Sequence, residues 1–131
     1  MGNPAAKAGD LIKATDIHQV TNPDGSVVPQ TSNFVGKLQD GCIDNVQING
    51  QPAAVVGSKA KNLAIHVPMP PAVSFVNPPK NEGEILKGSM TVMIGGKPAA
   101  RKGDLAMTCT DAPGPPAQVE VVGPANVTIG G

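Results

Sequence analysis

The chain has 131 residues, a length typical of one compact domain, so we expect residues 1–131 to form a single domain with no room for an appended enzyme or toxin. Its ten basic and ten acidic residues form no basic run, which excludes a nucleic-acid-binding surface. No stretch approaches the roughly 20 apolar residues of a membrane span, and the first residues lack a signal-peptide apolar core. We therefore expect no stable membrane insertion and synthesis in the cytoplasm without a signal peptide.

The composition limits the core and raises the question of disorder. The chain has 16 Gly, 14 Pro, two Phe and neither Trp nor Tyr, so its core is expected to be aliphatic and thin. The share of Gly and Pro approaches the roughly 25–30% typical of disordered chains. A net charge of zero, and a share of Val, Ile, Leu and Phe above the roughly 20% found in folded proteins, favour a folded chain with Gly and Pro in turns.

Taken along the chain, the predicted strands follow one repeated pattern. The pieces are Pro-Ala-Ala-Lys-Ala-Gly-Asp at 4–10, Val-Gln-Ile-Asn-Gly-Gln-Pro-Ala-Ala-Val-Val-Gly-Ser at 46–58, Val-Met-Ile-Gly-Gly-Lys-Pro-Ala-Ala-Arg-Lys-Gly-Asp at 92–104 and Val-Thr-Ile-Gly-Gly at 127–131. The two full copies align without a gap, and the pieces at the chain ends supply the two halves of a third. Because a divided copy is completed only if the termini meet, we expect a closed ring of three units about a pseudo-threefold axis. The alternative is three independent hairpins with common turn residues.

Each unit is predicted to be a β-hairpin. Val-x-Ile alternates with period two, and Asn49-Gly50 or Gly95-Gly96 suits a tight turn with positive φ. The Ala-Ala pair indicates crowding at the axis, and Gly-Asp or Gly-Ser suits a second turn. Long Pro- and Gly-rich loops connect the units, so we expect little helix, at most a short turn near Asp16 or Asn62. These loops are predicted at Asn22–Pro29, Val67–Pro71, Asn77–Pro79 and Asp111–Pro116.

The register of the repeats places three metal-ligating residue types at related positions. His18 and His66 each follow a repeat glycine by nine residues, and Cys109 follows Gly103 by six. A single histidine in such a loop is usually a solvated polar residue, but two imidazoles and a thiolate converging on an axis suit Zn²⁺, which would stabilise a thin core.

The spacing leaves the fourth ligand open. Asp111, Cys42 and a water molecule are candidates, although Cys42 is better interpreted as a small buried apolar residue. An open position would permit a zinc hydrolase, but neither histidine stands beside a general base, so we expect no enzyme activity.

The segments at 4–10 and 98–104 resemble the motif that names the PAAR-repeat family, and the likeness covers nearly the whole chain. Further matching segments are Ala14–His18, Gly57–Ala60 and Gly103–Cys109. The resemblance implies a small all-β cone of three pseudo-threefold hairpin repeats. Its broad base would sit on a trimeric VgrG-type spike, as in type VI secretion systems and phage-tail-like contractile injection machines. Such a tip is made in the bacterial cytoplasm and ejected with the spike to help penetrate the target envelope.

In this family a metal near the vertex is held by three His and one Cys. His18, His66 and Cys109 match those roles, whereas Ser32 and Asn33 stand where a further His is expected before Phe34. The fourth ligand, and the choice between Zn²⁺ and iron, therefore stay open.

The edges expected to contact the spike lie near Val46–Ile48, Val92–Ile94 and Val127–Ile129. The alternative function is a spike-cap adaptor that recruits non-covalent effector cargo through loops near Asn22–Ser32 or Phe75–Asn81.

Overall fold

The computed structural model describes residues 2–111, 116–123 and 126–130, and these residues form β-strands and no helix. The all-β expectation is confirmed. The short turn expected near Asp16 or Asn62 is wrong, because both residues lie in strands whose backbones pair with neighbours. None of the described segments is a helix able to span a membrane. Most of the loop expected at Asp111–Pro116, and the Gly131 end of the divided repeat, lie outside the described residues.

Thirteen strands make up the described fold. They are β1 Asn3–Pro4, β2 Leu11–Thr21, β3 Val27–Asp40, β4 Ile43–Ile48, β5 Gln51–Ala53, β6 Lys59–Asn62, β7 Ser74–Phe75, β8 Glu82–Ile85, β9 Met93–Ile94, β10 Lys97–Pro98, β11 Leu105–Met107, β12 Ala117–Glu120 and β13 Thr128–Ile129.

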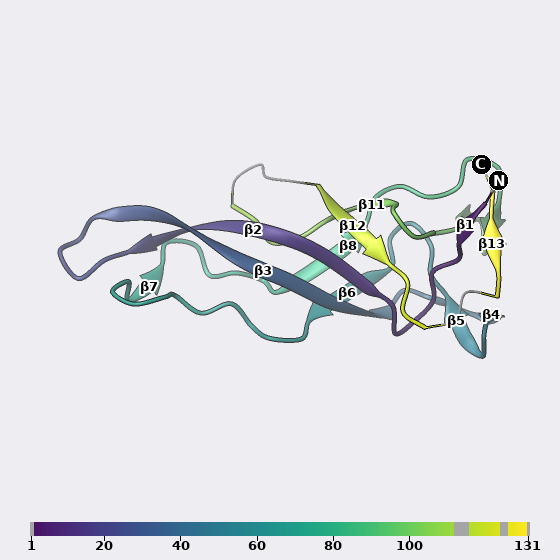
Figure 1. The fold of residues 1–131 in the computed structure, drawn as a ribbon, viewed down its shortest axis with the longest axis horizontal. Helices are drawn as coiled ribbons and strands as arrows, with labels where there is room; N and C mark the ends of the chain where they lie inside the picture. The colour runs from purple at the N-terminus through teal and green to yellow at the C-terminus, as the bar shows by residue number, and fades with distance from the viewer. Residues whose placement is uncertain (1, 112–115, 124–125, 131) are drawn as a thin grey trace.

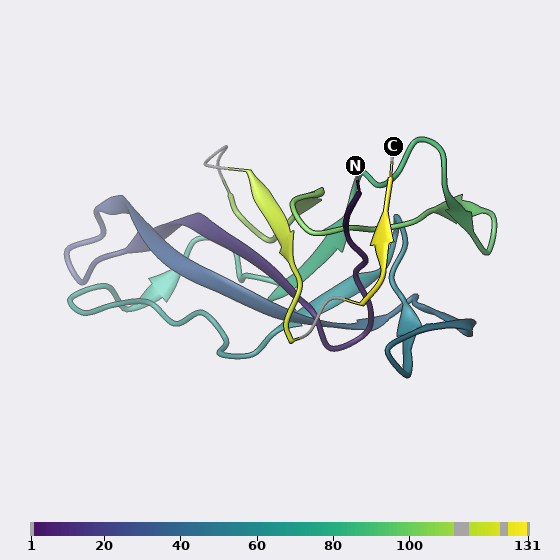
Figure 2. The same ribbon diagram turned by 45° about the vertical axis from the view of Figure 1, so that its right-hand side comes forward.

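Three short hairpins form the broader end of the molecule (Figures 1 and 2). They pair β4 with β5, β9 with β10, and, from opposite ends of the chain, β1 with β13. The register is the same in each: the residue before the repeat proline lies opposite the repeat isoleucine. The equivalent pairs are Asn3–Ile129, Gln51–Ile48 and Lys97–Ile94. The divided repeat is therefore confirmed.

The two complete hairpins turn as their sequences predict. Asn49 and Gly50 have φ angles of 52° and 82°, and Gly95 and Gly96 have φ angles of 61° and 80°. Positive φ at both central residues is the requirement of a type I′ turn, which Asn and Gly meet most easily.

A ring of backbone hydrogen bonds joins the three units at the axis. The amide of Ala6 donates to the carbonyl of Ala100 (2.9 Å), Ala100 donates to Ala54 (3.0 Å), and Ala54 donates back to Ala6 (3.0 Å). All three side chains are fully buried. A closed cycle in which each repeat contacts the next confirms the pseudo-threefold ring, and only a small side chain fits at its centre.

A six-stranded barrel lies next to the ring, and its core contacts the three ring alanines. The sequence patterns did not predict this barrel. The strands pair in the order β12-β11-β8-β6-β3-β2, and β12 also pairs with β2, which closes the barrel. Its largest buried side chains are Phe34, Ile12, Leu38, Ile85 and Val119. The prediction of an aliphatic core is thus wrong at Phe34, whose ring fills space next to Gly36 and Ala60.

The β2–β3 hairpin continues beyond the barrel and forms the narrower end of the molecule, where β7 pairs with β2 (Figure 1). The loop expected at Asn22–Pro29 is therefore mostly a hairpin, and Pro29 lies within β3 opposite Gln19. The strand tolerates this proline because Gln19 bonds elsewhere: its amide donates to Asp111 and its carbonyl accepts from Val76.

Candidate metal centre

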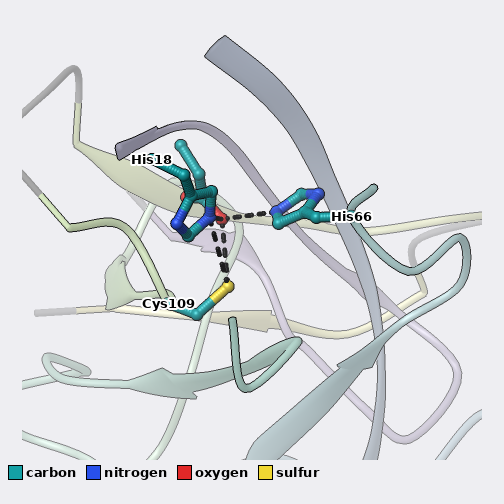
Figure 3. Close-up of side chains that lie close together, drawn as sticks. His18, His66 and Cys109 are labelled. Carbon is teal, nitrogen blue, oxygen red and sulfur yellow. Dashed lines mark hydrogen bonds and ion pairs between the residues drawn. The ribbon is translucent and has the colours of Figure 1, made fainter. Parts of the chain in front are cut away.

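Each of the three predicted ligands comes from a different repeat unit. His18 lies on β2, His66 follows β6, and Cys109 follows β11. The three side chains point toward one another (Figure 3). The structure therefore brings together all three residues selected from the repeat register.

Asp16 joins this group and lies at its centre. Its Oδ2 atom is 2.9 Å from His66 Nε2, 3.4 Å from Cys109 Sγ and 3.9 Å from His18 Nε2. Cys109 Sγ lies 3.8 Å from His18 Nε2. One ligand atom from each of the four residues lies within 4.8 Å of the other three.

The cluster is almost closed to solvent. Asp16 and His18 are fully buried and His66 is 8% exposed, whereas Cys109 is partly exposed. Burial, together with the Asp16 carboxylate, raises the pKa of the Cys109 thiol to about 11. The Thr108 hydroxyl donates to the other Asp16 oxygen, Oδ1.

Two asparagines fix the segment that carries His66. The side-chain oxygen of Asn81 accepts the His66 amide (2.9 Å) and the Asn62 side-chain amide (3.0 Å). One phenyl ring packs edge-on against each imidazole. The ring centroids of Phe75 and His18 lie 5.4 Å apart, and those of Phe34 and His66 lie 6.2 Å apart. The imidazoles are therefore held in a dry environment by groups outside the cluster.

Neither of the two protein candidates for the fourth ligand belongs to the cluster. Asp111 lies on the far side of the His18 ring, with Oδ1 3.5 Å from Nδ1, outside hydrogen-bond geometry. A carboxylate there suits an orienting role behind a ligating imidazole. Cys42 packs partly buried against the barrel core, and burial raises its pKa. Its interpretation as a small apolar residue agrees with this position.

Asp16 was not predicted as a metal ligand, because the sequence indicated a short turn near this residue and not a strand. Residues two apart on a strand share a face. The pattern Asp-x-His at 16–18 would therefore have predicted that Asp16 lies beside His18 if β2 had been predicted as a strand. Ser32 and Asn33, expected in a loop, lie in β3, and Ser32 is directly opposite Asp16.

The donor set fits a divalent transition metal. Nitrogen, thiolate sulfur and carboxylate oxygen are the ligands of zinc, and bond lengths of about 2.0–2.3 Å give a tetrahedron with edges of roughly 3.3–3.8 Å. Two of the four separations above, 3.4 and 3.8 Å, fall in this range, and the distance of 3.9 Å between Asp16 and His18 lies just above it. The shortest one, 2.9 Å between Asp16 and His66, is a hydrogen bond. The buried cluster could hold a metal ion.

A surface pocket of about 570 Å³ reaches this cluster at Cys109. Cys109 and Thr108 line it, and neither histidine does. Cys109 is thus the candidate ligand most open to solvent.

Fold and site together define a small all-β protein with pseudo-threefold symmetry and a buried cluster of metal-ligating side chains. Residues 77–131 match the PAAR motif family. The match includes the repeat at 92–104; the strand pairing extends the same pattern to the other two repeats. No curated protein and no solved structure matches the chain. A PAAR motif implies a spike-tip protein that binds a VgrG spike of the type VI secretion class and is secreted with it.

Proposed function

We propose that this chain is the metal-stabilised tip that caps a trimeric VgrG-type spike of a contractile injection machine and helps it penetrate the target envelope. The observation that supports this most is the closed cycle of hydrogen bonds among Ala6, Ala54 and Ala100. It gives one chain a three-part base, so a single copy can match a partner with true threefold symmetry. The family whose motif matches residues 77–131 is generally non-enzymatic, and we propose the same here.

The base hairpins supply the surface for the spike. Val46, Met93 and Val127 come from three different units and are 37%, 56% and 39% exposed. We infer that β4, β9 and β13 pair with the three end strands of the spike, because short edge strands leave backbone groups open for an added strand. One copy would then cap each trimer.

Native mass spectrometry of the chain mixed with a VgrG-type spike tests this proposal. We expect one copy per spike trimer. The paired substitution Val46→Asp with Met93→Asp should reduce binding at least about tenfold, because charges would be buried at the contact. Val27→Asp with Val73→Asp, which changes exposed residues at the narrower end, is the matched control and should bind normally. Equal binding by both variants would reject the base as the contact surface.

We further propose that His18, His66 and Cys109, with Asp16 as fourth ligand, hold Zn²⁺, with iron as the alternative ion. Four protein ligands would complete a tetrahedral shell and leave no open position, the arrangement of a structural site. Bound metal would contribute folding free energy and tie three repeat units together near the narrower end. The thiol exposed to the pocket would give the ion its route in.

Elemental analysis of purified variants tests the ligand set. We expect about one equivalent of metal in the wild type and a loss of most of it in His18→Ala, His66→Ala and Cys109→Ser, with Asp16→Asn weakened. Cys42→Ser is the matched control, since that thiol lies outside the cluster, and it should keep its metal. Equal metal content in all variants would rule out this centre.

Residues 1–131 are proposed to act as one PAAR-type domain. The pairing of β1 with β13 and of β2 with β12 supports this, because residues from both ends of the chain share the same structural units. We also propose that the chain leaves the bacterial cytoplasm with the spike, because a tip is carried by the structure that it caps.

A further inference from the structure

A run of exposed aliphatic side chains, interrupted by other residues, leads along the chain toward the narrower end of the molecule. The run follows β6 and reaches β7, along the lower side of the ribbon in Figure 1. Its members are between 48% and 70% exposed: Leu63, Ile65, Val67, Met69, Val73 and Val76. We call these six residues the apolar strip. Exposed aliphatic groups that follow one another along a single segment make it a candidate interaction surface.

Charge is nearly absent around the apolar strip. Residues 63–79 contain no Asp, Glu, Lys or Arg, and residues 19–36 of the neighbouring hairpin contain only Asp24. His66, the one titratable residue of the first stretch, is buried. Asp24 is therefore the only acidic or basic residue in these two stretches that an electrostatic partner, such as a charged protein, could meet.

Part of the backbone of the apolar strip is already hydrogen-bonded within the protein. The amides of Leu63, Val73 and Val76 donate to the carbonyls of Val35, Thr21 and Gln19. The Met69 amide donates to the Gln30 side chain, and the Met69 carbonyl accepts from it. Pro68, Pro70 and Pro71 lie in the same stretch and have no amide proton to satisfy. Backbone groups that enter lipid must be satisfied internally, and four of the six amides of the strip are.

We propose that the apolar strip is a lipid-contacting surface that inserts reversibly into the interface of an electroneutral bilayer. The inference rests on the proposed function, because a tip presents its end opposite the spike to the envelope. The chemistry favours lipid over protein. The strip contains none of the Trp, Tyr or Arg that dominate protein contacts, whereas interfacial lipid binding scales with buried aliphatic area.

Vesicle flotation with the full chain tests the proposal. The probes are phosphatidylcholine vesicles and vesicles with added phosphatidylglycerol, each at low and high salt. The test variant combines Ile65→Ser, Val67→Ser and Met69→Ser. The matched control combines Leu86→Ser, Met90→Ser and Val122→Ser, which removes three exposed apolar side chains elsewhere.

We expect the wild type and the control to float with phosphatidylcholine vesicles at both salt concentrations. The test variant should bind at least about tenfold more weakly. Thermal unfolding of each variant establishes that it is folded, and binding to a VgrG-type spike is measured separately. Normal spike binding by the test variant together with lost flotation would support the inference.

Three results would overturn the inference while leaving the spike-cap function intact. The first is a wild type that binds the spike but does not float with neutral vesicles. The second is flotation only with phosphatidylglycerol at low salt, which would assign binding to lysines of the barrel. The third is equal flotation of the test variant and the wild type.

Discussion

Replacing Asp10 by serine should destabilise the protein strongly, and replacing Lys7 by valine at the same time should restore most of the loss. Asp10 accepts the Lys7 amide (3.0 Å) and the Lys7 ammonium (3.0 Å), and both side chains are nearly buried. The equivalent turn of another repeat has Val55 and Ser58 instead, where the serine hydroxyl accepts the Val55 amide (3.0 Å). The fold therefore accommodates an uncharged pair at this position.

The expected loss of stability depends on which buried polar groups each substitution leaves without a partner. Asp10→Ser alone leaves a buried ammonium without its carboxylate, which costs about 3–5 kcal/mol. The double variant keeps the amide bond through the serine. It loses the acceptor for the Val122 amide and the Lys7 donor to the Val122 carbonyl, and because Val122 is half exposed we expect a cost of about 1–2 kcal/mol in total. At about 4 °C per kcal/mol, Tm should fall by about 12–20 °C and about 4–8 °C respectively.

A double-mutant cycle in urea and by thermal melting measures the coupling. Lys7→Val completes the cycle, and Lys13→Val, an exposed change on β2, controls for the loss of a lysine. If the double variant were as unstable as the sum of the single variants, the two turns would not be interchangeable and the reasoning would be refuted.

The other predictions concern the metal, the axis, the core and a thiol. A chelator should lower Tm by more than about 10 °C if the proposed ion is structural, and added Zn²⁺ should restore it. Gly88→Ala should cost about 1–3 kcal/mol in urea unfolding, because its Cβ would lie 2.5 Å from the Ala99 carbonyl oxygen; Gly130→Ala, which meets nothing within 4 Å, should be neutral. Phe34→Ala should cost about 3–5 kcal/mol, since the ring is fully buried. With the other thiol removed, Cys42 should react with iodoacetamide more slowly at pH 8 than a free cysteine, because its raised pKa lowers the thiolate fraction, and alkylation should accelerate as pH rises.

The repeats, their turns and the joining of the chain ends could be predicted from the sequence because each depends on local chemistry. Asn49-Gly50 and Gly95-Gly96 suit one kind of turn wherever they occur, and paired alanines indicate crowding without knowledge of the neighbour. The three candidate ligands His18, His66 and Cys109 followed from the same register, because equivalent positions in a ring lie near one axis.

The barrel, the extended β2–β3 hairpin and Asp16 could not be predicted in this way, because they depend on which distant strands pair. Pro29 signals a loop locally, and only the outward bonding of Gln19 allows it inside a strand. Asp16 joins the cluster because eleven consecutive residues of β2 pair with β3, which places Asp16 and His18 on one face. The sequence alone determined the three-part ring and three of the four candidate metal ligands. Tertiary pairing decided the barrel and the fourth candidate, Asp16, because burial and strand partnership are properties of the whole chain.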